Sequence, residues 1–187
     1  MADPLPTDSE RAHDEGMAAL REFYDEVDGQ ATRLAARHRE RLQCRRGCAS
    51  CCVDDLAVLD IEADRIRLNH ADLLRDGAPH PAGACAFLDG EGACRIYADR
   101  PFVCRTQGLP FRWFEEVDGA PVVERRDICP LNDTGPPLEE LPDEDCWLLG
   151  PAEGRLSELA ERQSALPKGD PTAPTRVALR SLFGPDR

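Results

Sequence analysis

Hydrophobic residues recur at steps of three and four along the first quarter of the chain. The recurring positions are Met17, Leu20, Tyr24, Val27, Ala31, Leu34, Ala35, His38 and Leu42. This spacing lines one face of an α-helix, and the pair Thr7 and Glu10 just before it is typical of a capping box. We therefore predict a long amphipathic helix over residues 8–43, with Gly29 as its weakest point.

Two further elements follow in the first two thirds of the chain. Asp60 is a predicted N-cap for a second helix that reaches about Arg75. Residues 111–117 and 121–126 are β-strand-like and flank an Asp118-Gly119 turn signal. This arrangement predicts a short β-hairpin.

The rest of the chain is mostly irregular. Residues 78–105 carry glycines, prolines and cysteines without a clear period, so we expect this segment to need a cross-link to hold one conformation. Residues 131–145 form an acidic, proline-rich surface excursion. Two short helical pieces, 154–165 and 174–183, should pack against the first helix. The predicted fold is α+β, α-rich and irregular, with the long N-terminal helix over a metal-organised cysteine loop region and a small β-hairpin.

Length and composition indicate one domain with tails. The chain has 187 residues, and only 41% are hydrophobic, a low share from which to build a large core. Metal cross-links could supply the missing stability. We expect a flexible N-terminus over residues 1–8, a cysteine-cluster metal-binding domain over 9–131, and an acidic Pro-rich loop with C-terminal helices packing on it over 132–187.

The net charge of −13 excludes two classes of partner. Phosphate backbones and anionic membrane surfaces would be repelled, so we expect no nucleic acid and no membrane. Residues 1–16 lack the features of a signal peptide, and there is no long apolar run. We expect a cytoplasmic protein, and the sequence points to no particular protein partner.

The candidate chemistry is carried by nine cysteines. In a reducing cytoplasm, closely spaced thiolates are better explained as metal ligands than as disulfides, and an odd number cannot pair completely. We treat Cys146, beside Trp147, as a non-ligating thiol. The eight candidate ligands are Cys44, Cys48, Cys51, Cys52, Cys85, Cys94, Cys104 and Cys129.

The spacing of the cysteines suggests how they are divided among metal ions. Cys44, Cys48 and Cys51 are four and three residues apart, which places them on one face of a helix or tight turn. The adjacent Cys51 and Cys52 should point apart, and so serve two metals or leave one packed thiol. Eight ligands fit two four-thiolate sites, or one cluster plus a structural ion.

Other polar residues near the cysteines could assist metal binding. Five arginines lie beside the cysteines and are expected as counter-charges: Arg45, Arg46, Arg95, Arg100 and Arg105. Among the histidines, His38 is expected to be packed, His80 is the best substitute ligand, and His13 and His70 should face solvent.

The spacing leaves the metal open between zinc and iron. A zinc ribbon needs two Cys-x2-Cys knuckles, and only Cys48 and Cys51 match one. The Cys-x3-Cys-x2-Cys triplet is the spacing of radical S-adenosylmethionine enzymes. Those enzymes place an aromatic residue before the last cysteine, where this chain has Ser50, and this chain lacks their repeated βα pattern.

The order of motifs over about residues 40–131 resembles the YkgJ-type cysteine-cluster family (CxxCxxCC), whose domains are described as zinc- or iron-chelating. The blocks are Cys44-x3-Cys48-x2-Cys51-Cys52, Cys85-Ala-Phe87-Leu88-Asp89, Cys94-Arg-Ile96-Tyr97, Arg100-Pro101-Phe-Val-Cys104-Arg105, Leu109-Pro110-Phe111 and Cys129-Pro130. The x3 first spacing departs from the x2 of the family's name, and Thr106-Gln107-Gly108 replaces a short aromatic stretch.

The resemblance implies metal binding and leaves the role open. We favour a non-catalytic protein that holds zinc or iron structurally or hands the metal on. The alternative is an iron–sulfur enzyme or redox module, because a related cysteine cluster occurs in flagellin lysine methylases. A third hypothesis is thiol-redox sensing without a bound metal.

Overall fold

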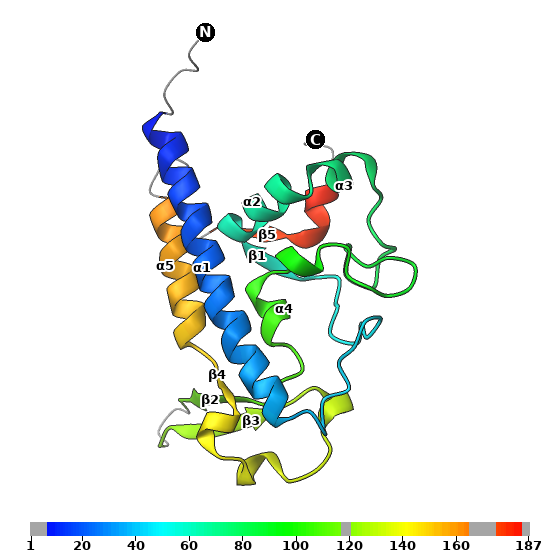
Figure 1. Cartoon of the computed structure of the whole chain (residues 1–187), viewed down its shortest axis with the longest axis vertical. Helices are drawn as coiled ribbons and strands as arrows, with labels where there is room; N and C mark the ends of the chain where they lie inside the picture. The colour runs from blue at the N-terminus through cyan, green and yellow to red at the C-terminus, as the bar shows by residue number, and fades with distance from the viewer. Residues whose placement is uncertain (1–6, 117–120, 165–174, 185–187) are drawn as a thin grey trace.

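The computed structural model describes residues 7–116, 121–164 and 175–184, and it has the predicted α-rich α+β fold. Helices α1 and α5 run side by side, α2 and α4 pack against α1, and the loop between α3 and α4 lies on the side away from α1 (Figure 1). The α-helices are α1 (Asp8–Arg37), α2 (Asp60–Asn69), α3 (Ala71–Asp76), α4 (Phe102–Thr106) and α5 (Pro151–Ser164). None of the described helices is both long and apolar enough to cross a lipid bilayer.

Short elements complete the described chain. The strands are β1 (Ala57–Leu59), β2 (Phe111–Glu115), β3 (Val123–Asp127), β4 (Trp147–Leu148) and β5 (Arg176–Ala178). The 3-10 helices are η1 (Tyr97–Asp99), η2 (Pro130–Asn132), η3 (Leu138–Glu140), η4 (Asp143–Asp145) and η5 (Leu179–Phe183).

The long helix α1 begins as predicted but ends earlier. The capping box of Thr7 and Glu10 is present, and the helix runs to Arg37 rather than to residue 43. His38 leaves the helical conformation, and its Nε2 lies 2.6 Å from the carbonyl oxygen of Asp145. Arg41 donates to the carbonyl of Pro136 at 2.5 Å. These contacts with a distant segment replace the last turns of the expected helix.

The predicted second helix is divided in two at His70. The backbone of His70 has φ −130°, and its Nε2 lies 2.9 Å from Oδ2 of Asp99. The expectation that His70 faces solvent is therefore wrong. The N-cap is Leu59 rather than Asp60, and the carboxylate of Glu62 accepts the hydrogen bond from the Leu59 N–H.

The predicted hairpin is confirmed, and a third strand joins it. Strands β2 and β3 are antiparallel, with Trp113 opposite Arg125; the turn at residues 118–120 lies outside the described residues. Strand β4 pairs in parallel with β2, so that Trp147 lies opposite Phe111. A strand of two residues is too short to leave a periodic pattern, so the sequence did not reveal it.

The C-terminal prediction is only partly correct. Helix α5 replaces the piece expected over 154–165 and begins three residues earlier, at Pro151. The piece expected over 174–183 is instead strand β5, paired antiparallel with β1, followed by the 3-10 helix η5. Backbone pairing with the edge of β1 is a long-range contact that a local helix signal cannot show.

Two hydrophobic clusters form the core. The first joins α1, α4 and α5 through residues such as Leu20, Phe102 and Leu156. The second contains Phe87, which is completely buried, and Ile96. The irregular segment 78–105 thus contributes large apolar side chains to the core, while its need for a cross-link stays a prediction.

The buried carboxylate of Glu62 connects α1, α4 and the start of α2. Oε1 of Glu62 accepts hydrogen bonds from the hydroxyl of Tyr24 at 2.9 Å and from the N–H of Phe102 at 2.8 Å. Oε2 accepts from the Leu59 N–H at 3.2 Å. Burial raises the pKa of Glu62, while the three donors oppose the rise. Glu62 therefore ties α1, α4 and the start of α2 together.

The substitution Glu62→Gln should weaken the fold. The amide keeps one acceptor oxygen but places an N–H₂ group against a backbone donor. Leaving a buried donor unpaired costs about 1–3 kcal/mol in the free energy of unfolding, which denaturant titration measures. The matched variant Glu22→Gln, at an exposed position of α1, should change stability little. Equal stability of the two variants would contradict the role of Glu62.

Candidate metal centre

Five cysteines from three parts of the chain come together on one side of the second hydrophobic cluster. We call Cys51, Cys52, Cys85, Cys94 and Cys104 the inner cysteine group. The N–H of Cys85 donates to the carbonyl of Cys52 at 2.9 Å, which joins the first cysteine loop to the second. Cys94 follows through an isolated β-bridge with Leu88, and Cys104 lies on the short helix α4.

The inner group is electrostatically coupled. Burial, together with the charges of Cys85, Cys94 and Cys51, raises the pKa of Cys104 to about 12. Burial likewise raises the pKa of Cys85 and, together with the charge of Cys85, that of Cys94. The raised pKa values favour the protonated form of Cys85, Cys94 and Cys104. A metal cation would reverse this balance, because it binds the thiolate form.

Cys51 and Cys52 lie on the same side, which corrects the expectation that they point apart. The Cys52 N–H donates to the carbonyl of Ala49, and the Val53 N–H donates to that of Cys51, so the backbone turns here instead of extending. The two side chains consequently influence each other: Cys52 lowers the pKa of Cys51, and Cys51 together with burial raises that of Cys52.

Cys44 and Cys129 belong to a second region, which is organised by Asn132. The side-chain Nδ2 of Asn132 donates to Sγ of Cys44 at 3.4 Å and to the carbonyl of Gly108 at 2.8 Å. Its Oδ1 accepts from the Gln43 N–H at 2.8 Å, and its own N–H donates to the carbonyl of Cys129 at 2.7 Å. Asn132 is completely buried. It therefore joins Gln43 and Cys44 to Gly108 and Cys129.

Cys48 is close to the same region. It lines a cavity of about 450 Å³ together with Arg45, Arg46 and Leu131, and Leu131 lies next to Asn132. We call Cys44, Cys48 and Cys129 the outer cysteine group. Cys44 is exposed, whereas Cys48 and Cys129 are half-buried. Each group has one exposed cysteine, Cys44 in the outer group and Cys51 in the inner, and only the inner group contains a fully buried one, Cys85.

Sequence reasoning missed Asn132. It assigned residues 131–145 to a surface excursion, and nothing in that acidic stretch marks one amide as buried. The only available signal was its place two residues after the Cys129-Pro130 pair. A buried amide that uses both its oxygen and its nitrogen is a structural anchor.

The arginines beside the cysteines mainly bind backbone and carboxylate groups. Arg105 is buried, donates to Oδ2 of Asp28 at 2.6 Å and lies over the ring of Tyr24. Arg95 donates to the carbonyls of Ala78 and Ala86, and so fixes the loop that carries Cys85.

The counter-charge prediction is supported for two of the five arginines. The charge of Arg95 lowers the pKa of Cys85 and Cys94, and that of Arg100 lowers the pKa of Cys94, although burial dominates at both thiols. Arg45 donates to the carbonyl of Gln43, and Arg46 lies 3.8 Å from a carboxylate oxygen of Asp89. These two contact other groups in the structure.

Besides His70, the structure describes the surroundings of His13, His38 and His80. His38 is buried, as predicted. His13 was expected to face solvent, but it is half-buried, with Nδ1 3.3 Å from Nε2 of Gln163. His80 is half-buried, and its backbone N–H donates to Ala86; its use as a substitute ligand stays a prediction.

Cys146 lies apart from both groups. It is buried next to strand β4, and Nη1 of Arg126 donates to its Sγ at 3.9 Å. Burial raises its pKa. This environment fits the prediction of a packed thiol.

All nine cysteines are free thiols. Across residues 7–116, 121–164 and 175–184, no three His, Cys, Asp or Glu side chains have the arrangement needed to hold a metal ion as they stand. The structure therefore gathers the inner group into one region without closing it around a point. The assignment of the eight cysteines as ligands stays a prediction.

Comparison with known families matches this region. Residues 43–130 fit the family model CxxCxxCC, described as "Putative zinc- or iron-chelating domain". The matched segment, a little under half of the chain, is similar to the domain of that family. It contains all eight candidate ligands and excludes Cys146, which confirms the resemblance drawn from the sequence. No curated protein and no solved structure matches the chain.

The substitution Gly108→Ala tests the outer group of the CxxCxxCC domain. Gly108 has φ +91°, and an added Cβ would lie 2.5 Å from Sγ of Cys44, so that thiol would have to rotate away from Asn132. Gly83→Ala is the matched control, because Gly83 has φ +100° with open space around it. Both variants carry about 1–2 kcal/mol of backbone strain, and only Gly108→Ala should lower the metal bound per chain. Equal metal contents would show that the position of Cys44 does not matter.

Proposed function

We propose that this protein binds zinc or iron through the thiolates of its CxxCxxCC domain, as a cytoplasmic protein with a structural or metal-handling role. One observation carries the proposal: five cysteines spread over residues 51–104 are close enough to raise or lower one another's pKa. Uncharged packing does not require thiols to gather in this way, whereas a shared cation does.

The donor set fits either metal. Thiolates are preferred ligands of zinc and of iron–sulfur clusters. The inner group has five sulfurs, more than the four that a tetrahedral site needs. Cys52, Cys85, Cys94 and Cys104 would hold the metal there, and Cys51 would donate or accept a hydrogen bond as their neighbour. Bound metal would supply the charge that keeps these sulfurs deprotonated.

The outer group is suited to a metal that exchanges. Cys44, Cys48 and Cys129 provide three ligands, which leaves a coordination position for solvent or another donor. The Asn132 amide donates to Cys44 and so orients its sulfur. Because Cys44 is also exposed, a metal held here could be handed to a partner. The two groups would thus divide structural and handling roles.

The same open position favours one alternative function. An iron–sulfur enzyme or redox module related to flagellin lysine methylases would need a coordination position that the protein does not fill. The cavity of about 450 Å³ beside Cys48 offers space for a small substrate at that position. Iron–sulfur clusters absorb visible light whereas zinc thiolates do not, so the colour of anaerobically purified protein distinguishes the two functions.

Cysteine substitutions test the ligand assignment. Cys104→Ser and Cys85→Ser should each remove roughly one metal equivalent per chain, because serine oxygen is a poor replacement for a thiolate ligand. Cys146→Ser, the matched control in a buried site outside the family segment, should leave the metal content unchanged. Elemental analysis of anaerobically prepared protein measures all three.

Two results would contradict the proposal. One is wild-type protein without zinc or iron after anaerobic preparation. The other is equal metal content in Cys104→Ser, Cys85→Ser and Cys146→Ser. Cys44→Ser separates the two groups, since it should weaken binding of an exchangeable metal and spare the metal of the inner group.

A further inference from the structure

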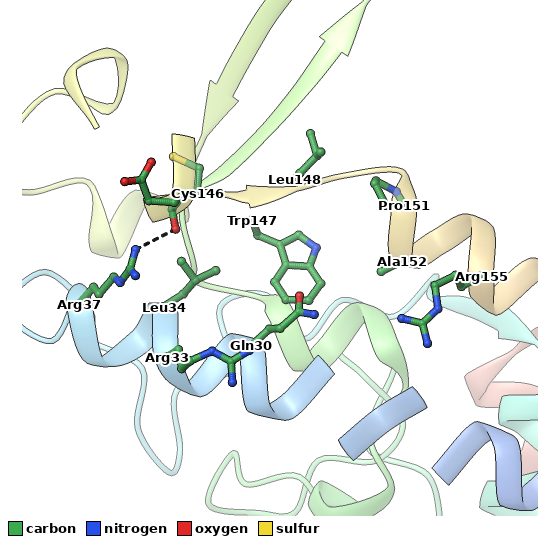
Figure 2. A pocket seen from close by; sticks show the side chains of 11 residues that line it. Gln30, Arg33, Leu34, Arg37, Cys146, Trp147, Leu148, Pro151, Ala152 and Arg155 are labelled. Atoms are coloured by element: carbon green, nitrogen blue, oxygen red, sulfur yellow. Dashed lines mark hydrogen bonds between the residues drawn. The ribbon is translucent and has the colours of Figure 1, made fainter. Parts of the chain in front are cut away.

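A second cavity lies outside the CxxCxxCC domain. It has a volume of about 400 Å³ and is bounded by α1, by the segment from η4 to β4, and by the start of α5 (Figure 2). Its lining residues fall in the ranges 30–37 and 144–155, on either side of the family segment. The proposed metal function does not use this cavity.

The cavity is lined by more arginines than carboxylates, in a chain of net charge −13. Three arginines line it, Arg33, Arg37 and Arg155, against one lining carboxylate, that of Glu144. Figure 2 shows the arginines projecting from α1 and α5 around one space. Such a concentration of guanidinium groups is typical of sites for carboxylate and phosphate.

The three arginines differ in their hydrogen-bond and ion-pair partners within the protein. Arg37 donates to the carbonyl of Glu144 at 3.1 Å and to Oδ1 of Asp145 at 2.5 Å. Arg155 pairs with Glu26 at 2.7 Å. Among the residues that the structure describes, Arg33 has no hydrogen-bond or ion-pair partner. Its charge is therefore available to a ligand.

Trp147 provides an independent indication of a ligand. Its side chain lines the cavity and is only 5% exposed, yet its Nε1 has no acceptor among the described residues. A buried N–H without a partner is unfavourable and rare in folded proteins. An acceptor oxygen bound in the cavity would satisfy it. The cavity also meets the first turn of α5 at Ala152, where backbone N–H groups favour negative charge.

We propose that this cavity binds a small organic anion. An anionic oxygen group, carboxylate or phosphate, would accept hydrogen bonds from Arg33, Arg155 and the indole N–H of Trp147. The apolar body of the ligand would lie against Leu34 and Leu148, which also line the cavity. A carboxylate and a phosphate would make the same contacts, so a separate probe is needed for each group.

Calorimetric titration of the full-length chain with benzoate and with phenyl phosphate tests the proposal. At least one probe should bind, and neutral benzyl alcohol should bind at least about tenfold more weakly, because it lacks the charge-assisted hydrogen bonds. Arg33→Gln should weaken the better probe by about tenfold or more. Arg162→Gln is the matched control, since Arg162 is an exposed arginine of α5 outside the cavity.

A second variant tests the indole directly. Trp147→Phe keeps an aromatic ring but removes the N–H, so it should also lower affinity, with far-ultraviolet circular dichroism confirming that the variant is folded. Preference for phenyl phosphate or for benzoate assigns the ligand class. The proposal is overturned if neither probe binds, or if Arg33→Gln binds as tightly as Arg162→Gln.

Discussion

The buried carboxylate of Glu62 is the interaction on which the arrangement of this protein depends. A single side chain accepts hydrogen bonds from Tyr24 on α1, from the backbone of Phe102 at the start of α4, and from Leu59 before α2. Desolvating a carboxylate is costly, and only the convergence of these donors offsets that cost. The three elements can therefore pack together only in an arrangement that brings all the donors to Glu62.

This contact also positions part of the candidate metal centre. Phe102 begins the short helix α4, and Cys104 lies two residues later on the same helix. A helix of five residues has little stability of its own, so its place is set by contacts at its ends. The Glu62 carboxylate holds the first residue, and the ion pair of Arg105 with Asp28 of α1 holds the last turn. Contacts of the protein scaffold thus place Cys104 near the other cysteines without a contribution from metal.

The remaining cysteines are placed by two different means. Loop-to-loop backbone bonds and the apolar side chains of the second core cluster bring Cys52, Cys85 and Cys94 together. A single buried amide, that of Asn132, organises the region of Cys44 and Cys129. The first arrangement includes the buried Cys85, which is part of the core cluster, whereas the second holds the exposed Cys44 by one amide; this difference is the physical basis for assigning them different roles. The arginine-lined cavity is built from other segments altogether.

Local sequence determined the elements whose stability is local. The capping box and amphipathic face of α1, the β2–β3 hairpin and the spacing of the cysteine motifs could all be predicted, because each depends on residues close together in the chain. Tertiary structure decided the rest. The end of α1 at Arg37, the pairing of β5 with β1, the meeting of Cys51 with Cys52 and the burial of Asn132 each depend on partners or turns that local periodicity does not encode. Contacts between residues far apart leave no periodic signal, because their free energy arises only when the chain has folded.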